Sequence, residues 1–321
     1  MDYDIINQVY EEIISIVNDY ARKNNCEYEV ARKLSFALLG YYLVMGPEIF
    51  KKLNILLDSV RIYEFISNED YQKKAIEISP KLEENKHNLR YNPITIWDYR
   101  YDSNNNFLGG IPNILYMRDK TIDNVLSISH EMSHGLEGVS ASVESEDEDY
   151  VYINQGFTHL TVDKESNRFR VEGGSGFIEL VTSSLENRIL NEFLKLDVQK
   201  IDSSLLREFL GEIKVYKSKN VMSRSYDLLN SIFKDLTDNP EFYDLIKDYF
   251  YDNDENGFKV KYESYGNGLI YKVLKDAAEH LSVDNLSVSD AIYYGDIIKR
   301  QAENFNKATN YEPDKKLLIL V

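Results

Sequence analysis

Hydrophobic residues recur every three or four positions along the first part of the chain, which is the spacing of one face of an α-helix. The pattern predicts amphipathic helices over 4–23 and 28–45, and Pro47 begins a third helix that runs to about Leu57. We expect the aromatic residues of this segment to lie in the core. The residues on the two faces are Ile5, Ile6, Val9, Ile13, Ile16 and Val17, then Leu34, Ala37, Leu38 and Tyr41.

The period then changes to the alternation that is typical of strands. Gly109, Gly110 and Pro112 predict a break just before the last of these strands, which we expect at an edge of a small sheet. An edge strand there is either covered or open to pairing with an extended peptide. The predicted strands are 60–65, 94–99 and 113–117, and a helix over 69–78, capped by Ser67 or Asn68, follows the first of them.

A helix that begins near Thr121 carries the most informative stretch of the chain, His130-Glu131-Met132-Ser133-His134. Gly135 and Gly138 are expected to end this helix. Its apolar stripe should pack on the sheet, with the two histidines partly off the stripe and toward a cleft. That stripe consists of Ile122, Val125, Leu126, Ile128, Met132 and Leu136.

Beyond this helix, the acidic run over 144–149 is typical of a solvated loop, and a calcium site or a docking patch for a basic substrate is the alternative. Residues 150–172 have the pattern of β-hairpins, and 177–196 that of a helix after a glycine-rich stretch. We expect further helices at 203–216, 222–236, 241–250, 268–282 and 287–309.

The composition excludes several classes of protein. A hydrophobic content of 43% describes a globular chain, and a net charge of −17 over 321 residues argues against nucleic acid as a partner. No run of residues is apolar and long enough to span a membrane. With one cysteine, Cys26, and no visible signal peptide, the sequence predicts a cytoplasmic protein, although a trimmed chain would hide an export signal. Cys26 itself is interpreted as a small residue beside a helix.

His130 and His134 are four residues apart, so one helical face offers two imidazoles to a single metal ion. Glu131 follows the first of them, where its carboxylate can act as a general base toward water on the metal. Zinc suits this arrangement because it accepts imidazole nitrogen and keeps one position open in catalytic sites. The pattern therefore predicts one zinc ion per chain. The alternative is that the two histidines and the glutamate fell into this pattern by chance.

A catalytic zinc site needs a third protein ligand, and Glu179 is the best candidate. Glu179 lies in the first turns of its helix and has the small residues Thr182 and Ser183 three and four positions later. Glu186 is a partner for a ligand or, as an alternative, the ligand itself. His159 is another alternative, whereas His87 and His280 are interpreted as surface or satisfied histidines.

These two segments resemble the gluzincin group of zinc metallopeptidases, in which a glutamate on a second helix completes the site begun by His-Glu-x-x-His. Residues 130–134 match that motif in full, and Gly176-Phe-Ile-Glu179-Leu-Val-Thr182 is similar to the third-ligand segment. Ser183 stands where thermolysin-like members have Asp, so the carboxylate that orients His130 must come from elsewhere.

The resemblance implies a predominantly helical α+β, zincin-like fold. The resemblance covers about 60–190 and implies two parts, a mixed lobe whose small sheet carries the motif helix and a mostly helical lobe with the third ligand. With the helices predicted ahead of them, we expect a helical lead-in over 1–58, the mixed lobe over 59–172 and the helical lobe over 173–321. The sequence does not indicate an oligomeric state.

The resemblance also implies a mechanism. Zinc on His130, His134 and Glu179 lowers the pKa of its water toward about 7. Glu131 then takes the proton as water attacks a peptide carbonyl and passes it to the leaving amine. Tyr226 and Arg224 are candidates for stabilising the oxyanion. The competing interpretations are a zincin-fold protein that binds metal and a partner without hydrolysis, and a zinc hydrolase of a non-peptide amide or ester.

Overall fold

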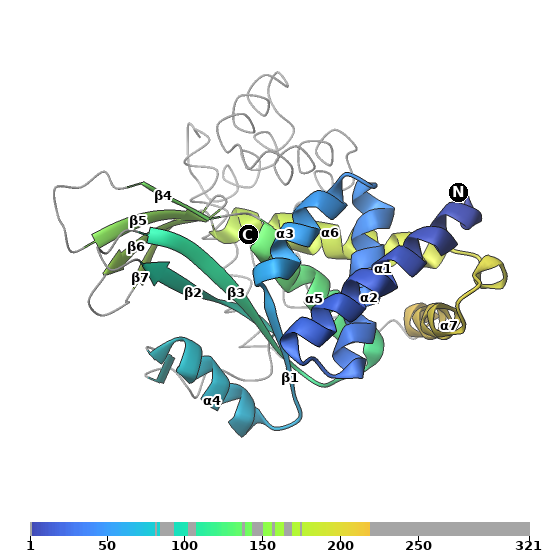
Figure 1. The fold of residues 1–321 in the computed structure, drawn as a ribbon, viewed down its shortest axis with the longest axis horizontal. Coiled ribbons are helices and arrows are strands. Elements are labelled where there is room, and N and C mark those ends of the chain that lie inside the picture. The colour runs from blue at the N-terminus through green and yellow to red at the C-terminus, as the bar shows by residue number, and fades with distance from the viewer. Residues whose placement is uncertain are drawn as a thin grey trace, which may run out of the picture. The chain divides into compact units, whose positions relative to one another are not determined.

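The computed structural model describes residues 2–80, 82–83, 93–101, 107–136, 139–142, 150–155, 158–163, 169–173 and 175–218 (Figure 1). The described chain is α+β and predominantly helical. Its helices are α1 (Tyr3–Asn24), α2 (Tyr28–Met45), α3 (Ile49–Ser59), α4 (Asn68–Ile78), α5 (Thr121–Leu136), α6 (Ser175–Lys195) and α7 (Ser204–Ser218). Its strands are β1 (Arg61–Phe65), β2 (Ile94–Tyr101), β3 (Phe107–Met117), β4 (Val139–Ser142), β5 (Tyr150–Gln155), β6 (Thr158–Asp163) and β7 (Phe169–Gly173).

The described elements form two compact units. The first contains α1 to α5, β1 to β3, α6 from Leu185 onward, and α7; the second contains β4 to β7 and the start of α6. These units do not follow the predicted ranges 1–58, 59–172 and 173–321. The helical lead-in belongs to the same unit as the sheet because α2 packs against both α1 and α5.

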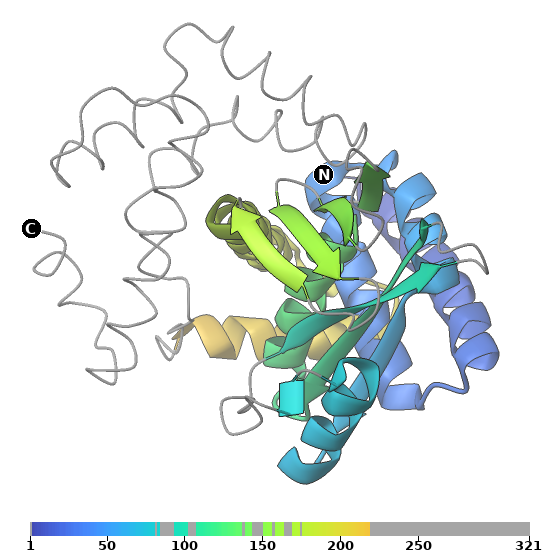
Figure 2. The same ribbon diagram turned by 90° about the vertical axis from the view of Figure 1, so that its left-hand side faces the viewer.

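The sheet of the first unit has the strand order β1-β3-β2, with β1 parallel and β2 antiparallel to β3 (Figure 2). The prediction that 113–117 lies at an edge is wrong, because Asn113 to Met117 pair with β1 on one side while Asn113 to Leu115 also pair with β2 on the other. In this sheet, as far as the structure describes it, β2 is an edge strand with β3 beside it.

The predicted break at Gly109, Gly110 and Pro112 is also wrong, since β3 begins at Phe107 and runs through these residues. Pairing with β1 starts only at Asn113, so Pro112 lies where β3 has a partner on one side and its missing N–H is tolerated. At Gly110 a Cβ atom would come within 2.7 Å of the Trp97 ring, so glycine lets the two strands approach there.

Helices cover both faces of this sheet. Tyr71 and Ala75 of α4 form a buried cluster with Ile96 of β2 and Leu115 of β3. Because successive side chains of a strand point to opposite faces, Thr95 lies on the other face, which α5 covers. The sheet therefore lies between α4 and α5, and α2 packs against α5.

The predicted apolar stripe of α5 is confirmed, since all six of its residues are buried. The Tyr41 hydroxyl of α2 hydrogen-bonds to the Ser133 hydroxyl at 2.6 Å and donates to the Ser129 carbonyl, so the rotation of α5 is fixed one residue away from His130. Gly135 does not end α5 as predicted: it lies within the helix, where a Cβ atom would be 2.8 Å from Leu56 of α3.

The second unit contains a four-stranded antiparallel sheet in the order β4-β5-β6-β7. The hairpins predicted over 150–172 are confirmed as β5, β6 and β7, whereas β4 was not predicted. The predicted helices at 177–196 and 203–216 correspond to α6 and α7. The acidic run over 144–149 and the helices predicted after 222 lie outside the described residues. None of the described helices is apolar and long enough to cross a membrane.

Candidate metal centre

The two histidines of α5 lie side by side in a buried part of the first unit. His130 is 8% exposed and Glu131 6% exposed, while His134 is half-buried. The centroids of the two imidazole rings are 5.2 Å apart and their planes are inclined by 71°. One helical turn thus brings the two imidazole rings together, as the spacing of the motif predicts.

The separation of the rings fits a shared zinc ion. Two imidazoles that bind one tetrahedral ion through nitrogens at about 2 Å have ring centres about 5 Å apart. The chemistry of the surroundings fits as well. Glu131 places a carboxylate inside the protein, and within the described chain no lysine or arginine forms an ion pair with it. A divalent cation between the histidines would offset that buried charge.

A second carboxylate lies beside His130. The Oε2 atom of Glu186, on α6, is 3.3 Å from the Nδ1 atom of His130, and the Glu186 side chain is 7% exposed. A carboxylate that accepts from Nδ1–H leaves Nε2 of the same ring as the metal donor. Glu186, seven residues after Glu179 on the same helix, is therefore placed to orient the His130 ring.

The Glu131 carboxylate has a partner that the sequence did not reveal. The Oγ1 atom of Thr95, on β2, is 2.8 Å from Glu131 Oε2 and 3.1 Å from the Glu131 main-chain oxygen. The two residues are 36 positions apart, so no local pattern connects them. The usable signal was the position of Thr95 as a lone hydroxyl between Ile94 and Ile96 on an otherwise apolar part of β2.

The remaining predicted residues cannot be placed at the site. Glu179 lies in α6, but its side chain is outside the described residues, as is that of His159 in β6. Tyr226 and Arg224 lie outside the described residues altogether, together with His87 and His280. Among the side chains that are described, no three His, Cys, Asp or Glu residues gather into a complete metal site.

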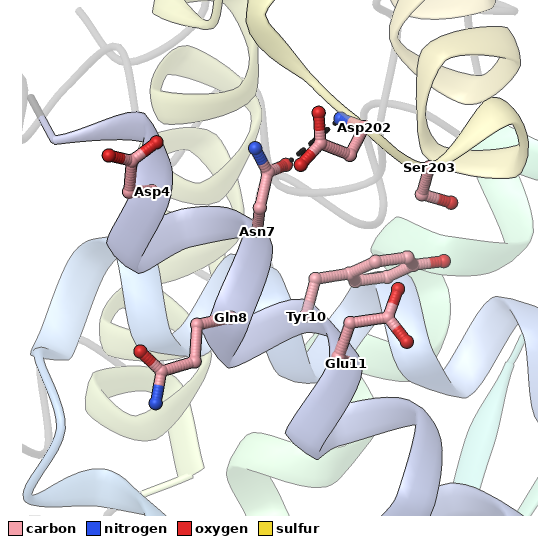
Figure 3. Close-up of a pocket in the computed structure, with 7 residues that line it drawn as sticks. All are labelled: Asp4, Asn7, Gln8, Tyr10, Glu11, Asp202 and Ser203. Atoms are coloured by element: carbon pink, nitrogen blue, oxygen red, sulfur yellow. Dashed lines mark hydrogen bonds between the residues drawn. The ribbon is translucent and has the colours of Figure 1, made fainter.

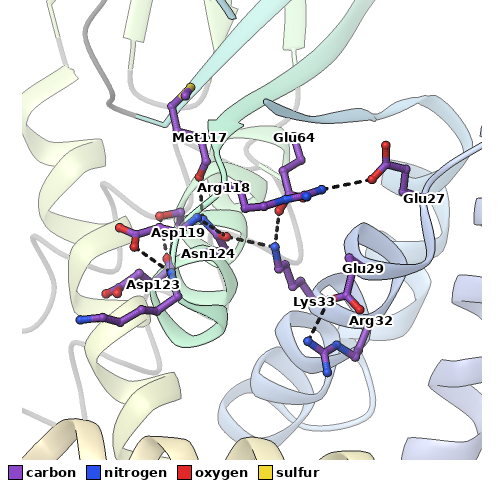
Figure 4. A network of polar contacts seen from close by, with 12 residues as sticks. Glu27, Glu29, Arg32, Lys33, Glu64, Met117, Arg118, Asp119, Asp123 and Asn124 are labelled. Carbon is purple, nitrogen blue, oxygen red and sulfur yellow. Dashed lines mark hydrogen bonds and ion pairs between the residues drawn. The ribbon is translucent and has the colours of Figure 1, made fainter. Parts of the chain in front are cut away.

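A different polar cluster surrounds the other end of α5 (Figure 4). Lys33 of α2 forms an ion pair with Glu64 of β1 and donates to the Asn124 side chain at 3.1 Å. Arg118 also pairs with Glu64, at 2.6 Å, and with Glu27 at 3.2 Å. We call Glu27, Lys33, Glu64, Arg118 and Asn124 the ion-pair network. It fixes the start of α5 against α2 and β1.

A shallow pocket of about 310 Å³ lies elsewhere in the first unit, between the start of α1 and the residues before α7 (Figure 3). The Asn7 side chain crosses it, donating to the Lys200 carbonyl at 3.2 Å and accepting from the Asp202 N–H at 3.1 Å. None of the motif residues lines this pocket, and its hydrogen bonds serve to hold the segment before α7 on α1.

Cys26 lies between α1 and α2, beside a helix as the sequence predicts, and it is partly buried. Burial, followed by the negative charges of Glu27 and Glu64, raises the pKa of its thiol to about 11. A thiol with this pKa is almost entirely protonated at neutral pH, so it is a poor nucleophile and a poor metal ligand.

Comparison of the chain with protein-family models, with curated proteins and with solved structures gives no match. The chemistry assigned to the chain therefore depends on the side chains of α5, β2 and α6 that meet in the first unit.

Proposed function

We propose that the protein is a zinc-dependent metallopeptidase with a zincin-like fold. The observation that carries the proposal is the pair of adjacent imidazoles on α5, with a buried carboxylate next to the first of them in sequence. A site that only held metal for structural reasons would have no use for a buried carboxylate in that position. A cytoplasmic location, predicted from the cysteine content, is part of the same proposal.

In this proposal His130, His134 and Glu179 hold the ion. Zinc supplies a Lewis acid that lowers the pKa of bound water to about 7. Glu186 is then the orienting carboxylate for His130, which replaces the acid that is missing at Ser183. A close approach of α6 to α2 supports a fixed position for Glu186, since a Cβ atom on Gly40 would come within 2.4 Å of Ile189, one turn further along α6.

The chain's own part in the reaction is proton transfer by Glu131. Its carboxylate accepts a proton from water as the water oxygen forms a bond to the substrate carbonyl carbon. The same group then gives this proton to the amine as the carbon–nitrogen bond breaks, so that one water is consumed for each peptide bond. Tyr226 and Arg224 remain our proposals for the donors that stabilise the oxyanion.

A peptide is the proposed substrate because an edge strand lies next to the motif. β2 contributes Thr95 to the Glu131 carboxylate and, in the described sheet, has β3 on one side. An extended peptide can add to such an edge through main-chain hydrogen bonds. The net charge of −17 favours peptides over nucleic acid as ligands.

The proposal is tested by replacing Glu131 with Gln in the zinc-loaded protein. We expect hydrolysis of a fluorogenic peptide library to fall by a factor of about 10² to 10⁴, because the general base is lost. Zinc content should stay at the parent value, because the two imidazoles remain. Ser127→Ala is the matched control, because among the described residues the hydroxyl that it removes donates to the Asp123 carbonyl within α5 alone.

The other outcomes separate the alternatives. Zinc binding without hydrolysis of any peptide by the parent chain would favour the metal-binding, non-catalytic protein. Hydrolysis of amide or ester probes with no cleavage of peptides would favour a zinc hydrolase of another substrate class.

A further inference from the structure

The Glu131 carboxylate is held by a single side chain in the described chain, the hydroxyl of Thr95. That hydroxyl has one proton and two oxygens within reach, both of them belonging to Glu131. A carboxylate is the stronger acceptor, and it is also the closer one here, at 2.8 Å against 3.1 Å. The proton of Thr95 is therefore directed to Oε2, and Oε1 is left for other chemistry.

The hydroxyl is itself fixed by the sheet. Thr95 pairs with Ile114 of the central strand, and the next pair is Ile96 with Asn113. The buried Asn113 amide donates to the Ile96 carbonyl at 3.2 Å and to the Ile111 carbonyl at 3.0 Å, which locks β2 and β3 together at this point. A threonine side chain is also stiff about its first torsion because it is branched at Cβ.

We propose that Thr95 is a positioning residue that holds one oxygen of Glu131 so that the other is aligned for proton transfer. This role depends on the proposed function, since it concerns the same general base. A base on a rigid helix still rotates about its own side-chain bonds, and a misplacement of about 1 Å is enough to cost a large part of the rate. The hydrogen bond from Thr95, on β2, restricts this rotation of the Glu131 side chain.

The test compares Thr95→Val, which keeps the branched shape but lacks the hydroxyl, with Thr95→Ser, which keeps the hydroxyl. The substrate is the fluorogenic library peptide that the parent chain cleaves fastest. We expect kcat to fall at least about tenfold in Thr95→Val, with KM and zinc content within about twofold of the parent. Thr95→Ser should recover most of the lost kcat, which a purely structural role of the threonine would not produce.

An unchanged kcat in Thr95→Val, while Glu131→Gln is inactive, would overturn the role of Thr95 and leave the proposed function standing. A parent chain that neither binds zinc nor cleaves peptides would instead remove the proposed function, and the role of Thr95 with it. Crystal structures give a second readout that needs no activity. Glu131 should occupy several rotamers in Thr95→Val and one in the parent, and a single unchanged rotamer in Thr95→Val would contradict the proposal.

Discussion

Two carboxylates with buried side chains lie near α5, Glu64 of β1 by its start and Glu131 within the helix, and they have opposite kinds of partner. Glu64 has a 2% exposed side chain and is contacted by two cations, Lys33 and Arg118. Glu131 is 6% exposed and receives one neutral hydroxyl, that of Thr95. Lys33 and Arg118 of the ion-pair network balance the negative charge of Glu64. The described surroundings of Glu131 contain no lysine or arginine that does the same.

This difference separates a structural cluster from a site. A buried ion needs a partner of opposite charge, and the ion-pair network meets that need with side chains that also fix α2, β1 and α5. Beside Glu131 in the sequence and one turn further on, α5 instead offers two imidazoles, a side-chain type that binds metal cations. We infer that a metal ion is the missing positive charge there.

The largest expected effect comes from neutralising each carboxylate in the metal-free protein. Glu64→Gln should lower the free energy of unfolding by about 3–5 kcal/mol, because Lys33 is left buried without its counter-ion. Glu131→Gln should change it by about 1 kcal/mol or less, because no ion pair is broken and the amide oxygen can still accept from Thr95. Urea denaturation of both variants measures the contrast.

A double variant serves as the control for that measurement. Lys33→Met with Glu64→Leu removes both charges and should recover most of the stability that Glu64→Gln alone loses. Equal losses in Glu64→Gln and Glu131→Gln would break the comparison, since the two carboxylates would then be equally dependent on partners within the chain.

A smaller effect is expected at Cys26, which lies near the ion-pair network. Its thiol pKa is raised to about 11 by burial first and by Glu27 and Glu64 next. Because the folded-state pKa is raised, the protonated thiol contributes stability that is complete below about pH 9 and is lost as the pH rises through about 11. Alkaline pH should therefore destabilise the protein in this window, and Cys26→Ala should remove the thiol's part of that loss.

The rate at which iodoacetamide alkylates Cys26 at pH 8 depends on the thiol pKa, so it responds to the charges of Glu27 and Glu64. Glu27→Gln removes a negative charge, so the thiol pKa should fall and the rate should rise on the order of twofold. Glu131→Gln should leave the rate unchanged, since its charge does not contribute to the shift at Cys26. A rate that responds equally to both variants would show that the two regions are not electrostatically separate.

Sequence periodicity was sufficient for most elements because helices and strands of this length carry their own pattern. The predicted helix over 28–45 corresponds to α2, and Ser67 caps α4 by accepting from the Asp70 N–H, as expected. The order of strands in the sheet does not follow from periodicity. It depends on which strands pair, so β3 was predicted at an edge and is central, and its glycines were interpreted as a break although they lie in the strand.

The motif residues could be predicted because four-residue spacing on one helix fixes their proximity. Their partners come from elements distant in sequence, such as Thr95 on β2, and no local pattern reveals them. Glu186 is an intermediate case. Its face of α6 marked it as a partner for a ligand, and only the packing of α6 shows that His130 is the residue beside it.

The central claim is that α5 holds a zinc ion, and metal content by mass spectrometry tests it most directly. We predict about one zinc per chain in the parent, none in His134→Ala or Glu179→Ala, and zinc bound about 10- to 100-fold more weakly in Glu186→Gln. A parent chain that takes up no zinc when it is supplied, or a His134→Ala variant that retains it, would contradict the account.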